Sequence, residues 1–92
     1  MNNFNFAVLE GFVREHNYYA DKQLFECGVE VKRSSKDENN VTTFLVKMEG
    51  RLAETCAKHL STGSRVLVSG MLQNDGHVHL AAKDVNFLAK KS

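Results

Sequence analysis

The chain has 92 residues, of which 42% are hydrophobic and 25% are charged, and its 12 basic and 11 acidic side chains leave a formal charge of +1. These values are typical of one compact domain over residues 1–92 with a short tail from 88, and they exclude a disordered chain or a strongly basic surface that attracts nucleic acid from a distance. Because no apolar run is long enough to span a bilayer and the first residues lack the pattern of a secretion signal, we expect a cytoplasmic protein without membrane contact.

The first apolar segment runs from Phe4 to Val13 and is interrupted by Gly11. Apolar residues occupy both alternations of this segment, which predicts a strand that is buried on both sides. The polar residues that follow, 14–22, predict a loop that contains Tyr18 and Tyr19.

Two further strands are predicted over 25–31 and 44–48, where apolar residues alternate with polar ones. The polar run KRSSKDENN over 32–40 separates them and predicts an exposed loop. The same alternation places the aromatic rings of Phe25, Phe44 and Phe87 in the core.

Beyond Gly50 the apolar spacing changes from two residues to four, which predicts a short helix over 52–60. Alternation returns at 66–72, and the turn Asn74-Asp75-Gly76 predicts a hairpin into a fifth strand that starts near Val78. This order of elements is that of the OB (oligonucleotide/oligosaccharide-binding) fold. We therefore expect an all-β protein, a five-stranded OB-fold barrel with a short helix between strands 3 and 4.

Residues that could carry catalysis or hold a metal are sparse. Cys27 and Cys56 form no metal-binding motif and predict buried free thiols. His77 and His79 alternate on one side of the fifth strand, but without a third ligand they predict solvent-facing histidines. We find no activated nucleophile and no phosphate-binding glycine loop, so we expect no enzymatic activity, no metal and no cofactor.

Three segments of the second half carry a set of family motifs. Residues 50–54 read GRLAE where the motif is G-K/R-L-A-E, and 62–72 read TGSRVLVSGML against K-G-S-x-V-x-V-x-G-x-L. Residues 82–88, AKDVNFL, fit a closing A-x-x-V-x-F-L, and the first strand with its glycine also fits. On these residues the chain resembles the DNA-binding domain of bacterial single-stranded-DNA-binding proteins over nearly its whole length. It also looks somewhat like primosomal replication protein N, a dimeric relative.

The resemblance implies sequence-tolerant binding of single-stranded DNA through stacked bases and a basic groove, usually by a homotetramer. It implies a role in DNA replication, recombination or repair. The family's base-stacking positions fall at Thr43, Glu49 and near Ser35, and none of these residues is aromatic. A fourth lies in a hairpin that is shortened here to 74–76. Stacking in this chain therefore requires other aromatic residues.

Eight residues are candidate nucleic-acid contacts. Phe12 follows the glycine of the first strand and could replace a lost stacking surface, while Tyr18 and Tyr19 would form a second platform in the loop before strand two. A subunit interface is an alternative use of all three. The basic candidates lie in or near the loop after strand two, on the polar side of strand three and after the hairpin: Lys32, Arg33, Lys36, Lys47 and Lys83.

The polar side of strands two and three also carries Glu26, Glu30 and Glu49, whose repulsion of phosphate would offset much of the attraction from two lysines. Two functions therefore remain open. One is binding of single-stranded DNA by a homodimer or homotetramer. The other is an OB-fold protein-interaction or primosome-type module with weak or no DNA binding, and replication or restart proteins are candidate partners of either.

Overall fold

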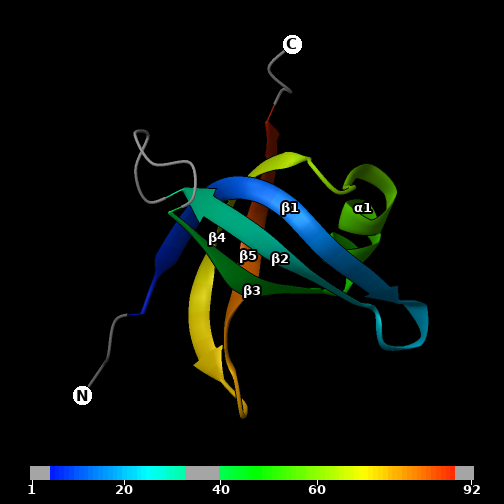
Figure 1. Cartoon of the computed structure of the whole chain (residues 1–92). Helices are drawn as coiled ribbons and strands as arrows, with labels where there is room; N and C mark the ends of the chain where they lie inside the picture. Colours follow the sequence, from blue (N-terminus) through cyan, green and yellow to red (C-terminus); the bar gives the residue numbers. More distant parts are fainter. Residues whose placement is uncertain (1–4, 33–39, 89–92) are drawn as a thin grey trace.

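The computed structural model describes residues 5–32 and 40–88. Five strands form a closed barrel, whose arrangement is drawn in Figure 1. Its elements are β1 (Ala7–Tyr19), a 3-10 turn η1 (Ala20–Lys22), β2 (Leu24–Lys32), β3 (Val41–Glu49), α1 (Arg51–His59), β4 (Arg65–Asn74) and β5 (Val78–Leu88). The strand order is β1-β2-β3-β5-β4, and β3 and β5 pair in parallel. This architecture confirms the predicted OB fold with its helix between β3 and β4.

The core lies inside the barrel and under α1. The inward alternation of the strands is buried, and α1 closes one end of the barrel with Ala53 and Cys56, followed by Leu60 just after the helix. Phe25, Met48 and Leu80 are the largest of the fully buried side chains. Burying one such side chain contributes about 1.5 to 3 kcal/mol of stability. The apolar spacing changes after Gly50 because strands and a helix bury residues in the same core.

Both cysteines are buried free thiols, as predicted. Desolvation, with a smaller contribution from Cys56, raises the pKa of Cys27 to about 12. Desolvation also raises the pKa of Cys56 to about 11. Both side chains therefore stay protonated at neutral pH and act as small apolar groups.

Two of the motif glycines lie where the backbones of neighbouring strands approach closely. A Cβ on Gly11 would lie 2.2 Å from the carbonyl oxygen of Glu30, and one on Gly70 would lie 2.1 Å from that of Ala81. Beside Gly70 the register of β5 shifts: Ser69 pairs with Asp84 but Gly70 pairs with Ala82, which leaves Lys83 in a bulge. Bulges of this kind change the direction of a side chain.

The loop predicted over 14–22 is largely strand, so this prediction was wrong. β1 continues to Tyr19, and its last residues pair with the start of β2, Tyr18 with Phe25 and Tyr19 with Leu24. The register shifts between Val13 and His16. Beyond this shift the side chains are exposed, so β1 has no apolar alternation there, although the backbone still finds partners on β2.

Phe44 and Phe87 are 39% and 44% exposed, so their assignment to the core was wrong. Phe44 follows the inward alternation with Val46 and Met48, but it lines an apolar cavity of about 370 Å³ together with Leu72 and Val78. Phe87 packs beside the end of α1, with its ring centroid 5.7 Å from that of His59. Periodicity identifies the side of a strand on which a residue lies, but not how far that residue is from the end of the barrel.

Within the described ranges, no helix has both the length and the apolar character needed to cross a membrane.

Candidate nucleic-acid interface

The outer face of β1, β2 and β3 presents side chains in rows, because residues paired across antiparallel strands lie on the same side of a sheet. Beginning at the end next to α1, the rows are Tyr19–Leu24–Glu49, then Asn17–Glu26–Lys47, and further along Phe12–Glu30–Thr43. Neighbouring strands lie about 4.8 Å apart, so the backbones of Tyr19 and Glu49 are separated by roughly 10 Å. A single strand of nucleic acid is long enough to cover several of these rows.

Most charges on this face are paired. The Arg14 guanidinium donates from Nε to Glu30 Oε2 at 3.1 Å and from Nη2 to Glu30 Oε1 at 2.9 Å. The hydrogen bond from Arg14 lowers the pKa of Glu30, and Glu30 in turn raises the pKa of Arg14. Lys47 Nζ lies 3.5 Å from Glu26 Oε2 and 3.4 Å from Asp75 Oδ2. Two of the three glutamates expected to repel phosphate are therefore compensated by cations.

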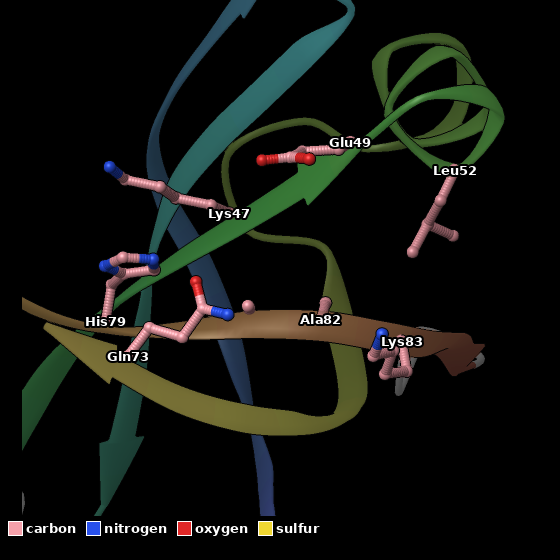
Figure 2. A pocket seen from close by; sticks show the side chains of 8 residues that line it. Lys47, Glu49, Leu52, Gln73, His79, Ala82 and Lys83 are labelled. Carbon is pink, nitrogen blue, oxygen red and sulfur yellow. The ribbon is translucent and has the colours of Figure 1, made fainter. Parts of the chain in front are cut away.

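A groove of about 340 Å³ lies between β3 and β5, next to the β4–β5 hairpin (Figure 2). Its lining comes from four elements: Lys47 and Glu49 on β3, Leu52 on α1, Gln73 on β4, and His79, Ala81, Ala82 and Lys83 on β5. OB folds bind oligonucleotides on the face of strands 2 and 3 and with the loops that follow strands 1 and 4. This groove therefore lies where the fold places its ligands.

His79 is buried, with 5% of its surface exposed, so the prediction of a solvent-facing side chain was wrong. Its Nδ1 lies 3.6 Å from Asp75 Oδ1 and 3.3 Å from the carbonyl oxygen of His77, which is itself exposed. β3 pairs with the next residues of β5, Val46 with Leu80 and Lys47 with Ala81. Among the described residues, no three His, Cys, Asp or Glu side chains gather into a metal-binding group.

Asp75 at the hairpin lies between the side chains of Lys47 and His79. Partial desolvation acts to raise its pKa, but the charge and hydrogen bond of Lys47, with a smaller contribution from His79, lower it overall. The carboxylate is thus stabilised in its ionised form beside the groove.

Tyr18 and Tyr19 do not form one stacking platform, which corrects the prediction. They are 38% and 39% exposed, but as consecutive strand residues they point to opposite sides of the sheet. Tyr19 belongs to the outer row of Glu49, and the Lys22 ammonium lies 5.8 Å from its ring centroid. Phe12 is half-buried on the same face, seven residues and roughly 20 Å further along β1.

The predicted basic residues separate into two groups. Lys47 and Lys83 line the groove together, whereas Lys32 is exposed at the far end of β2, opposite Val41. Arg33 and Lys36 lie outside the described residues. Arg14, Lys22 and Gln73 were not predicted for this surface. Arg14 was expected in a loop, and no sequence pattern indicates the register that brings Gln73 to the groove.

A closed five-stranded barrel with a groove beside its β4–β5 hairpin defines an OB-fold protein. Solved structures with the same fold include the small single-stranded DNA-binding protein from Streptomyces coelicolor, with a TM-score of 0.77 and 18% identity over 100% of both chains. The N-terminal domain of PriB from Thermoanaerobacter tencongensis, described as dimeric, has a TM-score of 0.73 and 22% identity over 94% of this chain and 98% of its own.

The mitochondrial single-stranded DNA-binding protein Rim1 from S. cerevisiae has a TM-score of 0.79 and 13% identity over 98% of this chain and 100% of its own. At such identities the likeness establishes the fold, and it agrees with the two families that the motifs resemble. No protein-family model matches the sequence. No curated protein matches it either.

Proposed function

We propose that this protein binds single-stranded DNA with little sequence preference and acts in DNA replication, recombination or repair. The observation that carries the proposal is the outer face that leads from Tyr19 over Leu24 to the groove of Lys47 and Lys83. It combines an aromatic surface with cations at the place where OB folds bind strands. The single-stranded DNA-binding proteins among the similar structures support the same function.

Phosphates are bound by the cations of this face, and bases stack on Tyr19. Two cations of the outer face and the groove have no ion pair with the described residues, Lys32 and Lys83. Arg51 also has none, but it lies on neither surface. Arg33 and Lys36 follow Lys32 in the chain and remain predicted contacts. Stacking on one exposed ring contributes about 1 to 3 kcal/mol per base and tolerates any sequence.

Self-association as a homodimer or homotetramer is part of the proposal. Exposed apolar side chains gather around the cavity of about 370 Å³, among them Phe44 on β3, Leu72 on β4 and Val78 on β5. Exposed apolar clusters of this kind favour a protein interface, and the similar PriB domain is described as dimeric. Light scattering coupled to gel filtration measures the mass directly, and a monomer at all concentrations would contradict this part of the proposal.

The alternative of a protein-interaction module depends on three carboxylates that oppose phosphate. Because Glu30 is paired with Arg14 and Glu26 with Lys47, only Glu49 keeps an uncompensated charge among the described residues of this set. The charge pattern therefore favours DNA. Replication or restart proteins remain candidate partners.

Fluorescence anisotropy of a labelled oligo-dT of about 35 nucleotides tests the function. We expect saturable binding whose affinity falls between about 50 and 200 mM salt, with the logarithm of affinity falling by about 0.7 per phosphate contact for each unit of log salt. Absence of binding at high micromolar protein would refute single-strand binding and leave the protein-interaction alternative.

A further inference from the structure

We propose that the groove beside Glu49 is a base-recognition pocket, which accepts a nucleobase with an exocyclic amino group in preference to thymine. This inference rests on the proposed single-strand function and adds a base bias to it. It concerns Glu49, whose carboxylate lies at the end of β3 and lines the groove.

The size and walls of the groove fit a single base. Its volume of about 340 Å³ falls within the range of small-ligand pockets. Leu52 on α1 and the neighbouring residues Ala81 and Ala82 of β5 supply apolar surface for a flat ring. Figure 2 shows Glu49 and Gln73 reaching the same groove from β3 and β4.

Two of the polar side chains in the groove, Glu49 and Gln73, are available to a ligand. Glu49 and Gln73 form no side-chain hydrogen bond or ion pair with any described residue. The nearby ammonium of Lys47 is already held by Glu26 and Asp75. An ionised carboxylate only accepts hydrogen bonds, whereas the Gln73 amide both donates and accepts them.

This set of donors and acceptors discriminates between bases. Cytosine, adenine and guanine each carry an exocyclic amino group that can donate to Glu49, and a Glu carboxylate accepting from cytosine N4 is a known pairing. Thymine has no amino group, and its single N3–H donor lies between two carbonyl oxygens that the carboxylate would repel. The Gln73 amide can donate to the acceptor ring nitrogen beside the amino group.

Lys83 supplies the cation for the same nucleotide. The bulge of β5 leaves Lys83 outside the strand pairing, it lines the groove, and no described residue forms an ion pair with it. A phosphate bound to Lys83 would hold the adjacent base over the apolar floor. The pocket thus combines hydrogen bonds to the base with a phosphate contact.

A competition assay tests the pocket: unlabelled oligo-dC and oligo-dT of equal length each displace the labelled strand from the protein, and their affinities are compared. We expect oligo-dC to bind about fivefold more tightly than oligo-dT. This ratio is the lower end of the discrimination that hydrogen bonds to a base edge provide. Oligo-dU, which lacks both the amino group and the methyl group, should bind like oligo-dT. If oligo-dU binds like oligo-dC, the methyl group is the cause and the inference is wrong.

Two variants, each of which removes one carboxylate, distinguish recognition in the pocket from a general electrostatic effect. Glu49→Ala should bring the dC-to-dT ratio close to one, while its overall affinity for DNA rises. Glu54→Ala removes an exposed carboxylate of α1 outside the groove and should keep the ratio of the unmodified protein. Equal affinity of the unmodified protein for all strands, or loss of the ratio in Glu54→Ala, would overturn the pocket and leave the function intact. Failure of every strand to bind would overturn both.

Discussion

The Lys47 ammonium lies 3.4 Å from the Asp75 carboxylate, so the β4–β5 hairpin places an anion on a cation of the groove. Glu26 holds the same ammonium from β2 at 3.5 Å. A DNA phosphate must therefore compete with two protein carboxylates for Lys47, and binding at this position is an exchange of partners.

Asp75→Asn should strengthen DNA binding by about twofold to fivefold, because it removes a surface ion pair of ordinary strength from Lys47. The salt dependence should become steeper by up to about 0.7 as one more phosphate contact forms. Anisotropy titrations at several salt concentrations measure both quantities. Asp84→Asn on β5 is the matched control, since this exposed carboxylate lies outside the groove. Equal gains in the two variants would mean that only the total charge matters.

Tyr19→Ala should weaken single-strand binding by about fivefold or more, because one stacked base is lost. Tyr18→Ala should have a much smaller effect, since Tyr18 points to the other side of the sheet while its exposure is nearly the same. Anisotropy measures both variants, and thermal unfolding checks that they fold alike. A larger loss in Tyr18→Ala would place the strand on the opposite side of the β1–β2 arm.

The Arg14–Glu30 pair should stabilise the fold only above acidic pH. The pKa of Glu30 in the folded protein lies below its ordinary value of 4.5 because Arg14 donates to it. A carboxyl group whose pKa is lower in the folded protein than in the unfolded chain stabilises the fold at pH values above its pKa in the unfolded chain. This stabilisation is lost as the pH falls through its pKa in the folded protein. Glu30→Gln should therefore lower the melting temperature at about pH 7, and the difference should shrink progressively as the pH falls below the ordinary pKa of 4.5.

Thermal unfolding across this pH range measures this effect, and Glu15→Gln is a suitable control because Glu15 has no partner among the described residues. A Glu30→Gln deficit that persists unchanged in acid would show that Glu30 acts through packing and not through its charge.

Gly70→Ala should destabilise the barrel by about 3 kcal/mol or more, since the new Cβ overlaps the backbone of Ala81 and neither strand can shift freely. Gly28→Ala should cost less, because its Cβ would meet only the Thr43 methyl group, at 2.9 Å, and that side chain can rotate. Denaturant unfolding gives both free energies of unfolding. Similar values for the two variants would contradict the close approach at Gly70.

Much of the fold was predictable because its signals are local. The apolar spacing of two residues in β2 and β3, four in α1 and two again in β4 follows from one buried face per element. The Asn74-Asp75-Gly76 turn specified the hairpin by its need for positive φ, which Gly76 adopts at 113°. The end of β1 carries no such signal, because its side chains are exposed and only its backbone pairs.

The candidate site was predictable only in part, because its contacts depend on register between distant segments. Arg14 and Glu30 meet across a register shift in the β1–β2 pair, and Lys47 meets Asp75 through the parallel pairing of β3 with β5. The sequence shows which charges lie on the outer face, but it does not show that Glu26 and Glu30 are paired. Tyr18 and Tyr19 were expected in one loop, whereas the strand separates them by its alternation.

Amide chemical-shift mapping by NMR, with isotope-labelled protein and a short oligo-dC, tests where the strand binds. We predict that the largest shifts fall on Tyr19, Leu24, Glu49, Gln73 and Lys83, along the outer row and the groove beside the hairpin. Shifts concentrated instead on the apolar cavity around Phe44 and Leu72, or on the outer surface of α1, would contradict the proposed interface, and no shifts at all would contradict DNA binding.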